Sequence, residues 1–306
     1  MKWTGVMPAI TTNFDANYKV DHGYVAEHCR WMIQSGCTAI VALGSLGEGS
    51  TLEYDEKLAI LDTCVRAAGS SAPVVAAISS LRTSEAAQLA KEAARRGCQG
   101  LMILPPYVYR GDWREMKSHV AAVLRATELP GMLYNNPVAY GTDFLPEHIA
   151  ELANEHPNLR AVKESSTDVR RVAAIRALLG DRLAILVGVD DCIVESIRMG
   201  AVGWIAGLAN VLPVESVDLF EYASNDQMDK ALALYNWFLP LLRMDTVPKF
   251  IQLIKLAQQE AGHGSARVRA PRLELDGPEL KEAKRVIARA LETRPQRQAE
   301  KTGARS

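Results

Sequence analysis

The sequence has few cysteines, and their spacing forms no pattern. There are five among 306 residues, an odd number, and no two of them stand in a Cys-x-x-Cys pair. A disulfide framework needs paired cysteines and a zinc site needs closely spaced ones, so neither is expected. We predict reduced thiols and a cytoplasmic location. The cysteines are Cys29, Cys37, Cys64, Cys98 and Cys192.

Long apolar runs and an excess of charge of one sign are also missing. No apolar stretch approaches the ~18 residues that a membrane-spanning helix needs, and the N-terminal residues lack the apolar core of a signal peptide. The formal net charge is −1, which gives no electrostatic reason to bind nucleic acid or an anionic membrane. We therefore predict that neither nucleic acid nor a membrane is a partner.

The sequence instead contains a regular alternation of short apolar runs and amphipathic stretches of helical period. Eight strands alternating with helices predict a parallel sheet, and eight units favour closure into a (β/α)8 TIM barrel. An open doubly wound sheet would place a glycine-rich phosphate loop after the first strand, where the sequence has Thr12-Asn13-Phe14-Asp15. The predicted strands are Val6–Thr11, Ala39–Leu43, Val74–Ile78, Leu101–Leu104, Met132–Asn135, Ala161–Lys163, Ala184–Val187 and Trp204–Ala206.

The alternation stops after about Asn225. We predict a catalytic barrel over residues 1–225 and a three-helix C-terminal appendage over residues 226–294. The polar residues 295–306 are expected to be a disordered tail. The three predicted helices of the appendage are Met228–Met244, Pro248–Gly262 and Glu279–Glu292.

Lys163 is the most informative single residue. It ends the apolar run from Leu159 and would lie at the carboxyl end of the sixth strand, the end that carries the active site in barrels of this kind. Burial there would lower the pKa of the amine, and a partly neutral lysine attacks ketones to form a Schiff base. Alone, such a lysine is more simply interpreted as one whose head reaches solvent.

Other strand ends carry weaker candidates. The loop Gly44–Thr51 could turn backbone N–H groups toward an anion, Tyr134 could transfer protons, and the small residues around Ile205 leave room for a ligand. Asp190 and Asp191 are interpreted as helix N-caps.

Histidine, by contrast, is missing from the strand ends. None of the six histidines falls there, and this disfavours a metal-dependent aldolase, so we predict no metal.

Three motifs together resemble the dihydrodipicolinate synthase and N-acetylneuraminate lyase family over nearly the whole chain. They are the Gly-Ser-x-Gly-Glu loop at Gly44–Glu48, the Tyr-Asn-x-Pro at Tyr134–Pro137, and the lysine in Val162–Ser165. Each motif is unspecific alone, but they follow in order on the second, fifth and sixth predicted strands.

The resemblance implies roles for individual residues. Lys163 would form the Schiff base with a 2-oxo acid, and Tyr134 would act as acid and base. Ser45 and the backbone around Leu46 and Gly47 would hold the substrate carboxylate, with Ile205 also lining the site. The family needs no cofactor and is usually a homotetramer.

The sequence departs from the true synthases at three places. Leu46 replaces the second hydroxyl residue of the strand-two loop, and Val108 falls where the synthases place a relay tyrosine that is shared between subunits. No arginine follows the Tyr-Asn-x-Pro motif, since the segment reads Val138-Ala139-Tyr140-Gly141-Thr142. These departures disfavour the lysine-biosynthetic reaction.

Among the remaining activities we favour the deaminase of 1-pyrroline-4-hydroxy-2-carboxylate, because apolar residues at Leu46 and Val108 suit a compact substrate with one carboxylate. The alternatives are a pyruvate-dependent aldolase of a 2-oxo-3-deoxy sugar acid or of 4-hydroxy-2-oxoglutarate, and 4-hydroxy-tetrahydrodipicolinate synthase. A non-catalytic barrel that binds a 2-oxo acid is a further alternative, although binding alone requires neither Lys163 nor Tyr134.

Overall fold

The computed structural model describes residues 1–296 and contains one eight-stranded parallel sheet that curves into a barrel. Neighbouring strands follow the order β1-β8-β7-β6-β5-β4-β3-β2. A bridge between Ala9 and Val41, with a 2.9 Å hydrogen bond from the Ile10 N–H to the Val41 carbonyl, joins the remaining gap between β1 and β2. The strands are β1 Gly5–Pro8, β2 Ile40–Ala42, β3 Val74–Ile78, β4 Gly100–Ile103, β5 Gly131–Asn135, β6 Leu159–Glu164, β7 Ala184–Val187 and β8 Gly203–Ala206.

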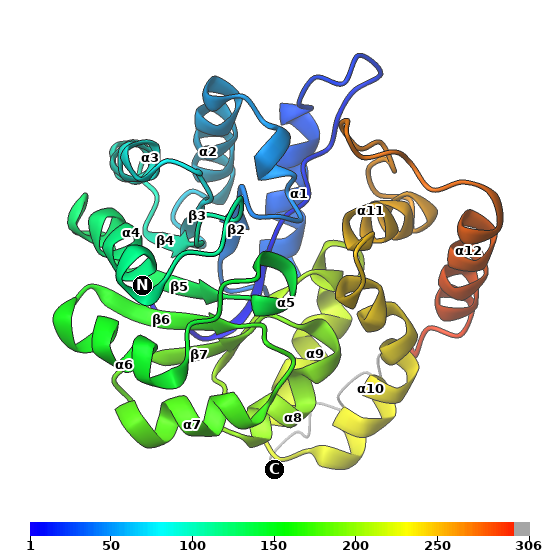
Figure 1. Ribbon diagram of the computed structural model, residues 1–306. Coiled ribbons are helices and arrows are strands. Elements are labelled where there is room, and N and C mark those ends of the chain that lie inside the picture. The colour runs from blue at the N-terminus through cyan, green and yellow to red at the C-terminus, as the bar shows by residue number, and fades with distance from the viewer. Residues whose placement is uncertain (297–306) are drawn as a thin grey trace, which may run out of the picture.

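Helices surround the strands, as Figure 1 shows. The α-helices are α1 His22–Gln34, α2 Tyr54–Ala68, α3 Thr83–Arg95, α4 Trp113–Arg125, α5 Pro137–Tyr140, α6 Pro146–Glu155, α7 Arg170–Leu179, α8 Ile193–Arg198, α9 Pro213–Ser224, α10 Met228–Leu242, α11 Phe250–Glu260 and α12 Gly277–Glu292. Short 3₁₀ helices are η1 Gly49–Thr51, η2 Asp190–Cys192, η3 Leu208–Asn210 and η4 Arg243–Thr246. The predicted (β/α)8 barrel with C-terminal helices is confirmed.

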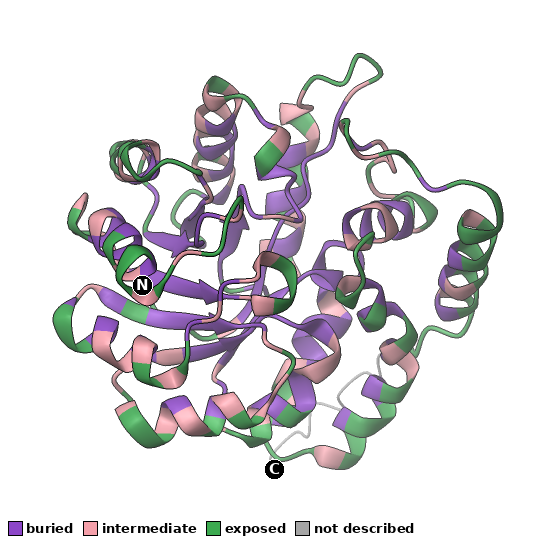
Figure 2. Ribbon diagram, viewed as in Figure 1, coloured by how far each residue is buried: buried purple, intermediate pink, exposed green. Residues whose placement is uncertain are grey.

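Figure 2 shows that the strands are mostly buried. Helices cover their outer face, and in closed barrels side chains fill the interior. Every residue of β3 is buried, which explains its unbroken run of Val, Ala and Ile. Only Arg160 of β6 is exposed. This packing explains why short apolar runs predicted the strands to within a few residues at each end.

The C-terminal part is helical as predicted, with α10, α11 and α12 in place of the three expected helices. The division of the chain at residues 225 and 294 remains a prediction. Most of the predicted tail, residues 297–306, lies outside the described residues. Within residues 1–296, no helix is both long and apolar enough to cross a membrane.

Candidate active site

Lys163 and Tyr134 face each other because their strands pair in register. β5 and β6 run parallel with Tyr134 opposite Lys163, and both residues stand near the carboxyl ends of their strands. The Lys163 Nζ lies 3.9 Å from the centre of the Tyr134 ring. Each residue retains only 6% of its surface exposed. The two sequence-predicted catalytic residues therefore meet at the carboxyl end of the barrel.

The surroundings of Lys163 favour a neutral amine. Burial lowers its pKa, and the nearby Tyr140, Asp245 and Asp190 oppose that effect. The side chain passes directly over Gly188, where an added Cβ would lie 2.3 Å from the Lys163 Cε. Glycine at the end of β7 thus makes room for the lysine.

The Tyr-Asn-x-Pro motif forms the next turn of the chain. Asn136 caps the short helix α5 by accepting a hydrogen bond from the Ala139 N–H at 2.9 Å, and its Nδ2 donates to the Tyr134 hydroxyl at 3.2 Å. Pro137 occupies the first helical position. This turn carries the Tyr140 ring back to within 5.6 Å of the Tyr134 ring, edge to face.

Buried polar contacts hold this turn in place. Asn135 donates to Glu164 at 3.0 Å and accepts from the Phe144 N–H at 2.9 Å. Arg171 binds Asp143 through two 2.7 Å contacts, a bidentate geometry that fixes orientation. The segment after β5 is therefore tied to both β6 and α7.

The loop after β2 presents Ser45 to the same site. The Ser45 hydroxyl is hydrogen-bonded to the Tyr140 hydroxyl. Leu46 is buried, and Thr12 donates to the Gly47 carbonyl at 2.7 Å. A Cβ on Gly47 would lie 2.8 Å from the Ile10 carbonyl, so the tight turn requires glycine. In the part of the chain that the structure describes, the backbone N–H groups of Leu46 and Gly47 have no protein acceptor.

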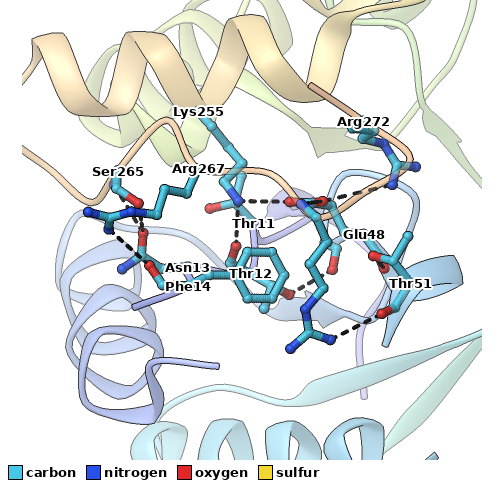
Figure 3. A network of polar contacts seen from close by, with 12 residues as sticks. Thr11, Thr12, Asn13, Phe14, Glu48, Thr51, Lys255, Ser265, Arg267 and Arg272 are labelled. Carbon is cyan, nitrogen blue, oxygen red and sulfur yellow. Dashed lines mark hydrogen bonds and ion pairs between the residues drawn. The ribbon is translucent and has the colours of Figure 1, made fainter. Parts of the chain in front are cut away.

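A buried ion pair anchors that loop to the C-terminal helices (Figure 3). Glu48 and Lys255 of α11 are 1% exposed or less and lie 2.7 Å apart. Lys255 also donates to the Thr12 carbonyl at 2.8 Å, and the Arg269 N–H donates to Glu48 at 2.9 Å. Arg272 lies 3.8 Å from the same carboxylate. The loop Gly44–Thr51 is thus held by residues distant in sequence.

The prediction that Asp190 is a helix N-cap is wrong. Asp190 is fully buried and accepts hydrogen bonds from the Trp204 Nε1 at 2.9 Å and the Leu208 N–H at 2.7 Å, across the end of β8. The residue before α8 is Cys192, which makes no side-chain cap. Burial raises the Asp190 pKa to about 6.

Sequence reasoning also missed Asp245 of η4. A Cβ on Gly207 would lie 2.5 Å from its Oδ1, so this carboxyl group lies directly against the end of β8. Burial and the neighbouring Asp190 raise the Asp245 pKa, while Lys163 opposes this. Asp245 is therefore a buried carboxyl group that interacts electrostatically with Lys163 and holds its proton to higher pH than a solvated aspartic acid. Asp245 follows the last barrel strand in the sequence, and the prediction considered only residues at strand ends.

The remaining candidates have different positions. Ile205 is buried in β8 and pairs with Met7. Val108 is 65% exposed on the loop after β4. In residues 1–296 no group of three or more His, Cys, Asp or Glu side chains could hold a metal ion.

Comparison with known proteins places this geometry in a family. The model of the Dihydrodipicolinate synthetase family matches residues 2–290. The chain belongs to this family. Members of the family are class I lyases that act on small molecules.

Similar proteins include named synthases. A 4-hydroxy-tetrahydrodipicolinate synthase of Geobacter metallireducens is 34% identical over 231 residues, 76% of this chain and 79% of its own length. The synthase structure from Methylacidiphilum fumariolicum SolV superposes with a TM-score of 0.92 at 26% identity, covering 95% of this chain and 97% of that one. The pyruvate complex of the synthase from Acinetobacter baumannii has a TM-score of 0.87 at 28% identity, covering 94% and 99%.

Proposed function

We propose that this protein is a lyase or hydro-lyase that forms a Schiff base between Lys163 and a small 2-oxo acid or cyclic imine. The observation that carries the proposal is the buried Lys163 amine 3.9 Å from the Tyr134 ring at the carboxyl end of the barrel. A buried amine with a lowered pKa attacks a carbonyl, and the resulting iminium draws electrons from adjacent bonds.

The site offers a place for each part of such a substrate. The Ser45 hydroxyl and the N–H groups of Leu46 and Gly47, which have no protein acceptor among residues 1–296, would bind the carboxylate. Tyr134 would exchange protons at the carbon next to the iminium. Burial raises the pKa of Tyr134, so that it remains a phenol able to donate.

For the substrate we propose 1-pyrroline-4-hydroxy-2-carboxylate. Lys163 would attack C2, and the ring nitrogen would leave C2 as an amine on C5. Loss of a C3 proton and of the C4 hydroxyl as water would follow and leave a C3=C4 double bond. Transfer of a proton from C5 and protonation of that double bond would then convert the C5 amine into an imine. Hydrolysis of the C5 imine and of the lysine imine would release ammonia and a semialdehyde. Asp245 supports this choice, since a carboxyl group whose pKa burial raises can donate a proton to a leaving hydroxyl near Lys163.

Two observations favour a second candidate, 4-hydroxy-tetrahydrodipicolinate synthase. Similar proteins carry that name, and an arginine lies near the position where the synthases hold one. A Cβ on Gly141 would lie 2.6 Å from the Arg110 Nε. Against it, Ala139 and Tyr140 fill the segment itself, and Arg110 is exposed on the loop after β4.

A turnover assay with matched variants tests the proposal. The substrates are 1-pyrroline-4-hydroxy-2-carboxylate, a 2-oxo-3-deoxy sugar acid, 4-hydroxy-2-oxoglutarate, and pyruvate with aspartate semialdehyde. We expect the cyclic imine to give the highest kcat/KM, Lys163→Ala to abolish it, and a chelator to leave it unchanged. Higher kcat/KM with pyruvate and the semialdehyde, lost in Arg110→Ala, would favour the synthase.

Two outcomes would contradict the Schiff-base proposal itself. Turnover that survives in Lys163→Ala but is lost with chelator would indicate a metal-dependent aldolase. Binding of a 2-oxo acid with no turnover of any substrate would indicate a non-catalytic barrel. We also propose a homotetramer, which light scattering on the purified chain would test.

A further inference from the structure

Tyr140 joins the two ends of the candidate site. Its hydroxyl is hydrogen-bonded to the Ser45 hydroxyl, and its ring meets the Tyr134 ring edge to face at 5.6 Å. Burial raises the pKa of both tyrosines, and interaction with Tyr140 opposes this rise for Tyr134. The three hydroxyl-bearing side chains therefore form a continuous series beside Lys163.

The resemblance to the synthases implies a different source for the third hydroxyl group of the relay. There a tyrosine from a second subunit would complete the relay, and the matching position here is Val108. Val108 has no hydroxyl and is 65% exposed. A partner subunit therefore has no phenol to contribute from that position.

We propose that Tyr140 is the relay residue between Ser45 and Tyr134 within its own chain, so that each chain holds a complete proton relay. When the Lys163 amine adds to a ketone, the ketone oxygen leaves as water and needs a proton. Tyr134 supplies that proton and regains one from Tyr140, which regains one through Ser45. The same path in reverse takes up the proton lost from C3.

The local structure is built to hold Tyr140 there. Asn136 caps α5, and Gly141 ends it in the left-handed region with φ 71°. The hydrogen bond from the Phe144 N–H to Asn135 returns the chain to the barrel. A four-residue helix fixed at both ends leaves the Tyr140 ring little freedom to move.

The inference rests on the proposed function, and Tyr140→Phe tests it. The readouts are the exchange of the pyruvate methyl protons for deuterium, followed by NMR, and the borohydride adduct of pyruvate on Lys163. We expect exchange to fall about 100-fold, with little change in the KM for pyruvate and in the melting temperature. Tyr109→Phe is the matched control, since Tyr109 is 52% exposed, and should exchange like wild type.

A mixed oligomer tests whether the relay lies within one chain. Lys163→Ala and Tyr140→Phe chains carrying different tags are co-expressed, and oligomers with both tags are purified. If Tyr140 acts only with Lys163 of its own chain, no site in the mixed oligomer holds both residues. Deuterium exchange then stays as slow as in the two single variants. If the chain is a monomer, slow exchange in Tyr140→Phe supports the same conclusion.

Three results would overturn the inference, and they differ from one another. Deuterium exchange in Tyr140→Phe at the wild-type rate would show that Tyr140 is not a relay residue, without contradicting the Schiff base. Recovery of exchange in the mixed oligomer would show that Tyr140 acts on a partner. Absence of any Lys163 adduct in wild type, with either pyruvate or 1-pyrroline-4-hydroxy-2-carboxylate, would overturn the proposed function and the relay with it.

Discussion

At the scale of single residues, the reactivity of Lys163 depends on its protonation. Burial lowers its pKa from 10.5, so the neutral amine should predominate well below that pH. We predict that the rate of imine formation with pyruvate rises with pH and levels off before pH 10.5. Reductive trapping measured across the pH range checks this. A rate that still rises at pH 10.5 would indicate an ordinary, solvated lysine.

The same burial should reduce stability. The unfolded chain binds a proton on Lys163 up to about pH 10.5, whereas the folded chain releases it at lower pH. Folding is therefore opposed at neutral pH, and the free energy of unfolding rises with pH between the two pKa values. We predict that Lys163→Met has a higher free energy of unfolding than the wild type at pH 7.

Urea denaturation measures this gain, with Lys19→Met as the control. Lys19 is exposed, so its replacement should leave the free energy of unfolding nearly unchanged. A Lys163→Met protein that is less stable than wild type would mean that the ammonium form is held by its neighbours.

At the scale of elements, the Glu48–Lys255 pair connects the loop Gly44–Thr51 to α11. Both charges are buried. Removing Lys255 leaves the Glu48 carboxylate with only the Arg269 N–H and the more distant Arg272. We predict that Lys255→Met lowers the free energy of unfolding by about 3 kcal/mol. We expect the double variant Lys255→Met with Glu48→Gln to recover part of the loss.

An exposed pair provides the comparison. Lys249 and Glu279 are 53% and 45% exposed, so Lys249→Met should cost at most about 1 kcal/mol. Equal losses in Lys249→Met and Lys255→Met, measured by urea denaturation, would contradict the structural role of the buried pair.

Elements also explain how much the sequence could predict. The strands follow from local apolar runs, and parallel strands bring their carboxyl ends together. The proximity of Lys163 and Tyr134 could therefore be predicted. Tyr140 was not, because a four-residue helix has no periodic signal. Nor was Asp190, since its acceptor role depends on Trp204 and Leu208, which only the closed barrel brings near. The Lys255 contact spans 207 residues and is equally invisible to local patterns.

At the scale of the whole molecule, the C-terminal helices are part of the site's support. Beyond Lys255, Gln258 of α11 binds Thr11 at 2.9 Å and Ser265 binds Asn13 at 2.9 Å. We predict that residues 1–225 alone show no cooperative unfolding transition, because buried Glu48 would lose its partner. Calorimetry checks this. A cooperative transition together with a Lys163 adduct would mean that the barrel is independent of the appendage.

The account as a whole depends on a covalent bond to one lysine. The most direct measurement is intact mass after borohydride reduction with pyruvate and with 1-pyrroline-4-hydroxy-2-carboxylate, followed by peptide mapping. We predict one adduct per chain, located on Lys163 and absent from Lys163→Ala. A folded wild-type protein with no adduct, or with an adduct on another lysine, would contradict the Schiff-base mechanism.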